Sequence, residues 1–238
     1  MCEMIRTEYA CSRDFHEKLF IFHHTFMYGY KRLCSVPHWN NTCFFNVCIN
    51  VLSYMEPMVE YCKDILSKVP GDPYSNSQSQ GPIIDLCRMI TRPGDCPWFN
   101  ENIYKQLFNE LGINFGEQSF PEYVFTKILD TLNIQNSYLF SVYSGREREN
   151  EKMNLCKFVS AHDHPLYILT DNATDQLDGY TEIAAIYSTY GHFISYFPLE
   201  GKALDDVKTR MYPNGFVPTD ELPQTKEVRL LINDSMME

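Results

Sequence analysis

The spacing of apolar residues changes near residue 137, and this change limits the possible folds more than any other feature of the sequence. In the segment 43–55, apolar residues recur three and four positions apart, which is typical of a largely buried helix. After residue 137, five short segments rich in β-branched and aromatic residues indicate strands. These segments are 137–143, 165–170, 182–187, 192–197 and 228–232. Helices followed by strands predict an α+β fold with a mostly antiparallel sheet.

Two positions in the first half of the chain have the pattern of a helix start. Asn41 or Thr42 precedes the run at 43–55 and can cap its N-terminus. Ser119 and Glu122 form a Ser-x-x-Glu pattern, which predicts a capping box at the start of another helix. The apolar face of that helix consists of Phe125, Ile128, Leu129 and Leu132. We expect this face to be part of the core.

The balance of charged residues argues against nucleic acid as a partner. Asp and Glu number 31 against 20 Lys and Arg, so the formal net charge is -11, whereas phosphate binding requires clustered Lys and Arg. The apolar fraction of 44% is sufficient for a buried core, and no apolar stretch reaches the roughly 18 residues of a membrane span. We therefore expect a single domain over 1–238, with neither nucleic acid nor a membrane as partner.

The nine cysteines show no regular spacing and form no Cys-x-x-Cys pair, so the usual structural zinc framework is missing. The N-terminal segment MCEMIRTEYACSRDF lacks the basic region and apolar run of a secretory signal. Free thiols in a reducing compartment, the cytoplasm or the nucleus, are therefore expected. We expect neither a metal ion nor a cofactor.

Cys43 and His192 are the candidates for a nucleophile and its base. Cys43 opens the apolar helical run, where the helix dipole and the first N–H groups favour a thiolate. His192 follows Gly191 and opens the predicted strand at 192–197, so its ring can project into a cleft from a rigid element. The base for a cysteine nucleophile lies close to it in space but not in sequence. Taken alone, each residue has a simpler interpretation, namely a buried inert thiol and a surface or core histidine.

Three segments, in the same order, resemble the sequence boxes of the ubiquitin-specific proteases. Segment 40–52 is similar to the cysteine box, 116–132 to the internal box and 180–197 to the histidine box. The residues that agree are Asn41, Thr42, Cys43, Phe44, Asn46, Ile49 and Leu52, then Gln118, Glu122, Tyr123, Leu129, Asp130 and Leu132, then Tyr180, Ile183, Ala185, Gly191, His192, Phe193 and Tyr196. Asn50 stands where the family usually has Gln.

The resemblance implies a papain-like fold in one catalytic domain. A helical thumb, about 36–135, would carry Cys43, and a β-rich palm, about 136–238, would carry His192. It also implies a thiol-dependent hydrolase that cleaves isopeptide or peptide bonds after the C-terminal Gly-Gly of ubiquitin. Ubiquitin and ubiquitinated proteins would be its partners.

A third polar residue orients the histidine in enzymes of this kind. The resemblance implies an Asp or Asn downstream of the histidine strand, in an Asp-Asp or Asn-Asp pair. Asp205 and Asp206 form such a pair, and Asn214 is the rival candidate. The sequence does not decide among the three.

The segment before Cys43 departs from the family pattern. His38 stands where the family has Asn, and Asn40 stands where it has Gly. We expect His38 or Asn40 to stabilise the oxyanion, together with the backbone N–H of Cys43. The resemblance also implies a cleft for the substrate tail that is lined by Gln118, Tyr190 and Gly191.

Two alternatives to a deubiquitinase stay open. One is a protease for another ubiquitin-like modifier such as SUMO, which also ends in Gly-Gly. The other is a non-catalytic ubiquitin-binding or scaffold protein with the same fold. The presence of both Cys43 and His192 favours an enzyme, whereas the altered residues before Cys43 favour the scaffold weakly.

Overall fold

The structure is a computed structural model that describes residues 36, 38–74, 78–93, 100–134, 140–143, 155, 159, 164–172, 176–207, 216–219, 222 and 225–237. Five α-helices come first in these residues: α3 (Cys43–Tyr54), α4 (Glu56–Ser67), α5 (Pro82–Thr91), α6 (Glu101–Glu110) and α7 (Pro121–Thr131). The strands follow: β1 (Phe140–Tyr143), β2 (Tyr167–Thr170), β3 (Tyr180–Thr189), β4 (His192–Phe197), β5 (Lys202–Leu204), β6 (Phe216–Val217) and β7 (Thr225–Asn233). Two short 3-10 helices, η2 (Pro198–Glu200) and η6 (Asp234–Met236), follow β4 and β7. The predicted α+β class is confirmed.

The strands form one sheet in the order β1-β2-β7-β3-β4-β5-β6. Its first pair, β1 with β2, is parallel, and its other described pairs are antiparallel. All five strands that the apolar segments predicted are therefore present in a mostly antiparallel sheet. The strand β7, which comes last along the described chain, lies between β2 and β3 in the middle of the sheet.

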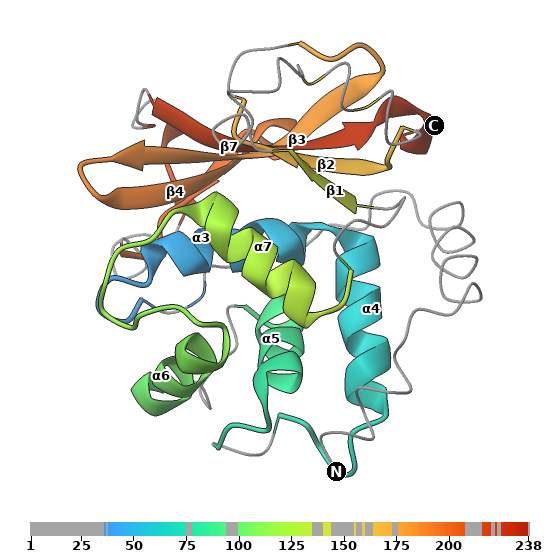
Figure 1. The fold of residues 1–238 in the computed structure, drawn as a ribbon. Coiled ribbons are helices and arrows are strands. Elements are labelled where there is room, and N and C mark those ends of the chain that lie inside the picture. Colours follow the sequence, from blue (N-terminus) through green and yellow to red (C-terminus); the bar gives the residue numbers. More distant parts are fainter. Residues whose placement is uncertain are drawn as a thin grey trace.

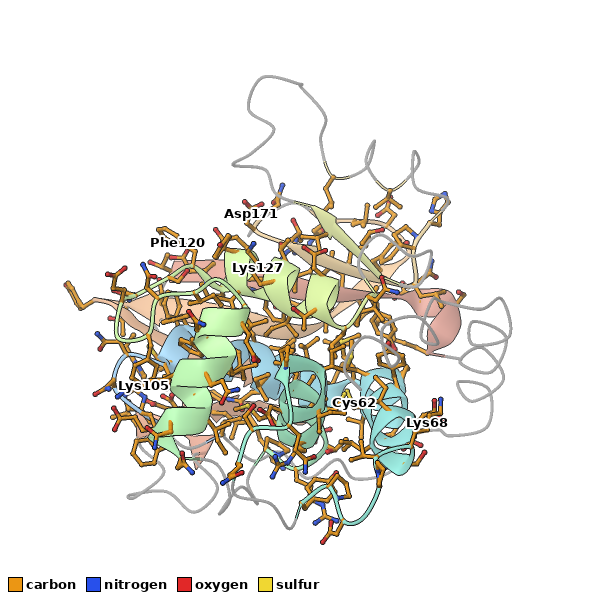
Figure 2. All side chains as sticks on the ribbon, turned by 60° about the horizontal axis from the view of Figure 1, so that its bottom comes forward. Cys62, Lys68, Lys105, Phe120, Lys127 and Asp171 are labelled. Carbon is orange, nitrogen blue, oxygen red and sulfur yellow. The ribbon has the colours of Figure 1, made fainter. Side chains whose placement is uncertain are left out.

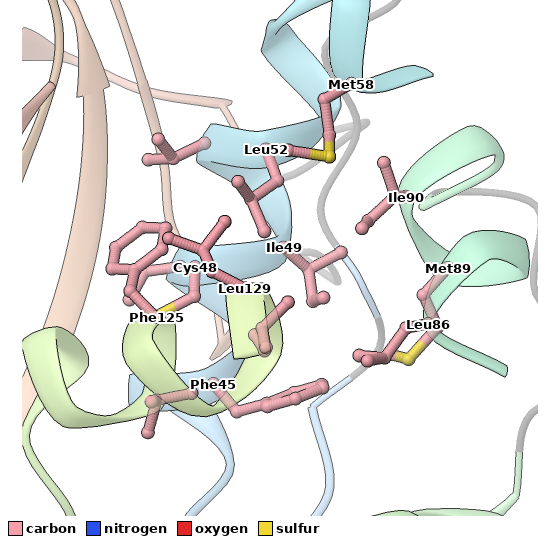
Figure 3. Packing of buried hydrophobic residues seen from close by; sticks show 14 of the residues in the cluster. Phe45, Cys48, Ile49, Leu52, Met58, Leu86, Met89, Ile90, Phe125 and Leu129 are labelled. Atoms are coloured by element: carbon pink, nitrogen blue, oxygen red, sulfur yellow. The ribbon is translucent and has the colours of Figure 1, made fainter. Parts of the chain in front are cut away.

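The helices pack together against one face of the sheet (Figure 1). α3 contacts β4, and α7 contacts β7. Side chains from three helices meet in the core between them (Figure 3), namely Phe45, Ile49 and Leu52 of α3, Leu86 and Ile90 of α5, and Phe125 and Leu129 of α7. Each fully buried side chain of this size stabilises the fold by about 1.5–3 kcal/mol. Because α3 is buried on every side, its position relative to the sheet is fixed.

Charged side chains lie on the outside of the helical layer. Figure 2 shows Lys68 and Lys105 on its outside, whereas Cys62 points inward and is fully buried. None of the described helices has the length and the apolar character that a membrane span requires.

The two predicted helix starts had different outcomes. Thr42 occupies the N-cap position of α3, as one of the two expected candidates, but its side chain makes no capping bond. The capping box of Ser119 and Glu122 was wrong, because α7 begins at Pro121 with Phe120 as N-cap and without a side-chain cap bond. Proline has the φ of a helix and no N–H to satisfy, so it suits the first helical position. The helix therefore begins later than the Ser-x-x-Glu pattern suggested.

Candidate active site

Cys43 is the first residue of α3, and the turn before it is held by two reciprocal bonds. The N–H of Thr42 donates to the carbonyl of Trp39 at 3.2 Å, and the N–H of Trp39 donates to Thr42 Oγ1 at 3.1 Å. Asn41 Nδ2 donates to the carbonyl of Gly116 at 2.9 Å, which joins this turn to the segment before α7. These bonds leave the thiol of Cys43 at a rigid helix N-terminus, where partial positive charge favours a thiolate.

His192 lies next to Cys43 because of a tight hairpin. Residues Thr189 and His192 pair across β3 and β4, and the two residues between them, Tyr190 and Gly191, have φ of 39° and 85°. A two-residue hairpin with positive φ at both positions matches the twist of the flanking strands. The hairpin brings the carbonyl of Gly191 to 3.9 Å from Cys43 Sγ. His192, the first residue of β4, therefore lies beside the thiol of Cys43.

Asp205 is the partner of His192. His192 Nε2 lies 2.8 Å from Asp205 Oδ1, which also accepts the backbone N–H of Val207 at 3.0 Å. The pairing of Ser195 with Leu204 is antiparallel, so the chain that leaves β5 runs back toward the start of β4. Asp205 is only 2% exposed. A buried carboxylate held by the backbone can fix the tautomer and the orientation of the ring.

The neighbouring Asp206 binds different groups. Its Oδ2 is 2.9 Å from His38 Nδ1 and accepts Asn46 Nδ2 at 2.6 Å. His38 precedes α3 and Asn46 lies in its first turn, so Asp206 connects the chain after β5 to the helix that carries Cys43. The two adjacent aspartates therefore face different partners, one on the sheet side and one on the helix side.

The surroundings of His192 favour its protonated form. Burial lowers the pKa of His192, but hydrogen bonds with Asp205 and Cys43, together with the negative charges of Asp205 and Asp206, raise it by more, to about 10. The ring is therefore an imidazolium at neutral pH. An imidazolium beside Cys43 stabilises a thiolate, which is the nucleophilic form of the side chain.

No family model and no curated protein matches this chain. The likeness to the ubiquitin-specific proteases thus rests on the three sequence segments. The function of the site has to be argued from its own geometry.

The structure brings most of the predicted site residues together. A Cβ at Gly191 would lie 3.1 Å from Gln118 Oε1, so Gln118 packs against the hairpin beside Cys43. Tyr190 is fully exposed at the tip of that hairpin. Asn40 is exposed in the turn before α3, with a φ of 47°. Asn214 lies outside the described residues.

Asn46 is a site residue to which the sequence gave no role. Its Nδ2 donates to Asp206 and also to Thr42 Oγ1 at 3.2 Å, and its Oδ1 accepts the hydroxyl of Tyr104 at 3.0 Å. Asn46 is fully buried. A polar residue inside the apolar run at 43–55 must find partners, because an unsatisfied buried amide is costly. This rule predicts that Asn46 has hydrogen-bond partners, but it does not identify Asp206 as its acceptor.

The ligand atoms of His192, Asp205 and Asp206 all lie within 4.8 Å of one another. Imidazole and carboxylate groups can bind metal ions. Here the ring nitrogen and one oxygen of each carboxylate already take part in hydrogen bonds within the site. We therefore interpret the cluster through proton chemistry.

Proposed function

We propose that this chain is a cysteine protease of the ubiquitin-specific type, with a papain-like arrangement of helices and sheet. It would hydrolyse the isopeptide or peptide bond after the C-terminal Gly-Gly of ubiquitin. The observation that carries the proposal is the hydrogen bond between the helix-start thiol of Cys43 and His192, whose Nε2 is bound to the buried carboxylate of Asp205. This is the arrangement of a nucleophile, a base and an orienting group.

The chemistry follows from the protonation states. The thiolate of Cys43 attacks the carbonyl carbon of the terminal glycine and forms a tetrahedral oxyanion. His192 then gives its proton to the leaving lysine amine, and a thioester with Cys43 remains. In the second half, neutral His192 takes a proton from water, which attacks the thioester. The products are the regenerated thiolate beside an imidazolium and the glycine carboxylic acid, which releases its remaining proton to solvent as a carboxylate.

The restricted access to Cys43 supports a Gly-Gly substrate. Cys43 is 3% exposed, and Gln118 and Gly191 pack closely against each other beside its thiol. A residue next to the scissile bond must therefore be small, and glycine adds no side chain. The net charge of -11 also suits the basic tail of ubiquitin. Phe120 and Tyr190, which are 59% and 108% exposed, offer apolar surface to the modifier's globular part.

Labelling with ubiquitin that carries a C-terminal electrophile tests this function. The wild-type chain should form a covalent adduct, Cys43→Ala should form none, and His192→Ala should react more slowly. Cys48→Ala is the matched control, because Cys48 lies on the same helix and burial raises the pKa of its thiol well above the usual value. This control should label like the wild type.

The alternatives make different predictions in the same assay. A protease for another modifier would react with a SUMO probe or a related Gly-Gly probe in preference to ubiquitin. A scaffold would bind ubiquitin without forming an adduct with any of these probes. Failure of every probe to react with Cys43 would refute the proposed protease activity.

A further inference from the structure

Three side chains that can form hydrogen bonds lie in a row on the face of α3 that meets the sheet. Cys43, Asn46 and Asn50 occupy positions i, i+3 and i+7 of the helix, so they share one face. Asn46 is fully buried, and Asn50 is 2% exposed. A buried amide is costly unless it is hydrogen-bonded. Both amides bind groups on the sheet side of the molecule, Asn46 the carboxylate of Asp206 and Asn50 the hydroxyl of Ser195.

The bond of Asn50 joins the helix that carries Cys43 to the strand that carries His192. Asn50 Nδ2 donates to Ser195 Oγ at 3.3 Å, and Asn50 Oδ1 accepts the backbone N–H of Val36 at 3.4 Å. Val36 and Ser195 are both fully buried. The bond to Ser195 therefore lies in the interior, between two elements that are far apart in the sequence.

Ser195 lies between aromatic neighbours on the inner face of β4. Alternate residues of a strand point to the same side, so Ser195 shares its side with Phe193 and Phe197, which belong to the core formed with the helices. Apolar contacts have no preferred direction, whereas a hydrogen bond weakens steeply as its angle departs from linear. The bond to Asn50 therefore adds a directional contact to a largely apolar interface.

The same position of β4 leads to the carboxylate that binds His192. Ser195 pairs with Leu204 between β4 and β5, and Asp205 directly follows Leu204. Asp205 Oδ1 lies 2.8 Å from His192 Nε2. A helix that is bound at Ser195 is therefore placed relative to both the imidazole and its carboxylate.

Asn46 and Asn50 attach α3 to the sheet side at two levels. They are four residues apart, which is roughly 6 Å along a helix axis. A helix attached at one point can still rotate about that point, whereas two attachments on one face prevent the rotation. Cys43 lies three residues before Asn46, so its thiol is at the end of the attached segment. A displacement of about 1 Å can lower a catalytic rate about 10²-fold.

We propose that Asn50 is a positioning residue, whose bond to Ser195 sets the register of α3 on β4 and thereby holds the thiol of Cys43 against His192. This proposal rests on the proposed cysteine-protease function. Asn50 lies about two helical turns from Cys43, so it acts through the helix. In coiled coils a single buried asparagine fixes the register of two helices at a cost in stability. Asn50 has the corresponding role between a helix and a strand.

A double-mutant cycle tests the bond. Ser195→Ala and Asn50→Leu should each lower kcat about tenfold for a fluorogenic ubiquitin amide, with little change in KM. The double variant should also lose about tenfold, since both substitutions remove the same bond. Rates are divided by the concentration of folded protein. Ser53→Ala is the matched control and should keep the wild-type kcat, because the hydroxyl of Ser53 binds the carbonyl of Ile49 within α3.

The charge of His192 gives a readout without turnover. The titratable groups that face its ring are Cys43 on α3 and Asp205 and Asp206 after β5, and the bond with Cys43 is one of the causes that raise the pKa of His192 to about 10. If Ser195→Ala moves the thiol away from the ring, nitrogen-15 NMR should find a lower pKa of His192 in the folded protein. Cys43→Ala shows the full effect of losing the thiol. A loss of stability alone would leave this pKa unchanged.

The variant Ser195→Ala decides the proposal, because it removes one oxygen atom and is expected to fold even if Asn50→Leu does not. If Ser195→Ala keeps either the wild-type kcat or the wild-type pKa of His192, the role of Asn50 is overturned. A hundredfold loss in the double variant would also overturn it, since the two side chains would then act independently. Absence of any Cys43 adduct in the wild type would instead refute the protease function. A lowered pKa of His192 in Ser195→Ala would still show that the bond positions the thiol.

Discussion

The Nε2 atom of His192 and the Oδ1 atom of Asp205 lie 2.8 Å apart, and the same oxygen accepts the backbone N–H of Val207. A ring that donates from Nε2 leaves Nδ1 to exchange a proton with the thiol of Cys43. The pair thus sets both the tautomer and the charge of the His192 ring.

Replacement of Asp205 tests this relationship. Asp205→Asn removes the negative charge that stabilises the imidazolium, so kcat should fall by about 10²-fold or more with a smaller change in KM. Steady-state hydrolysis of a fluorogenic ubiquitin amide measures both constants. Asp64→Asn, at an exposed residue of α4, is the control and should have wild-type kinetics. An unchanged kcat in Asp205→Asn would assign the orienting role to another residue, such as Asn214.

The raised pKa of His192 also predicts how stability depends on pH. The pKa rises from 6.5 to about 10 in the folded state, so the folded chain binds more protons than the unfolded chain between these values. The stabilising contribution is complete below about pH 6.5 and is lost as the pH rises through about 10. Urea unfolding between pH 6.5 and 10 should show this decline. His192→Gln should have a shallower slope, and equal slopes would contradict the assignment.

Substitution of Asn46 should lower the stability of the fold as well as disturb the candidate site. Asn46→Leu keeps most of the side-chain volume but removes a donor to buried Asp206 and the acceptor of the Tyr104 hydroxyl. We expect the free energy of unfolding to fall by about 3 kcal/mol, measured by urea denaturation. Tyr104→Phe removes one of these bonds and should cost about 1 kcal/mol. Equal costs for the two variants would show that the bond to Asp206 contributes little.

Gly191 should not tolerate a side chain. Its φ of 85° disfavours residues other than glycine, and a Cβ would lie 3.1 Å from Gln118 Oε1. Gly191→Ala should lower the rate of probe labelling by about tenfold, since a displacement of His192 of 1 Å can cost more than that. Gln118→Ala in the same chain should recover part of the rate by removing the steric contact. No recovery would leave backbone strain as the whole cause.

The sequence predicts the elements that have a long or strong pattern. The apolar run of α3 and the five predicted strand segments are readable because each covers at least two repeats of its period. β5 and β6 have three and two residues, which is too few for an alternation to show. The start of α7 was misplaced because Pro121 outweighs a Ser-x-x-Glu pattern one residue earlier. Local patterns thus fail where the segments are short or where two start signals compete.

The candidate site was predicted in part. Cys43 and His192 were candidates because of their positions at the starts of a helix and a strand, together with the resemblance of three segments to one family. The structure shows that these two starts lie together. The choice between Asp205 and Asp206 could not be made, because adjacent residues of an extended chain point to opposite sides. The register of β4 with β5 decides it, and register depends on contacts between distant residues. For the same reason the sequence could not connect Asn46 or His38 with Asp206.

The central place of β7 has a consequence for biosynthesis. Residues 225–233 leave the ribosome after every other described strand, and until then β2 and β3 lack the neighbour that joins them. The hairpin that carries His192 therefore has no completed sheet on which to dock against α3 until residues 225–233 have been made. The proposed nucleophile and base thus come together only after β7 has been added to the sheet.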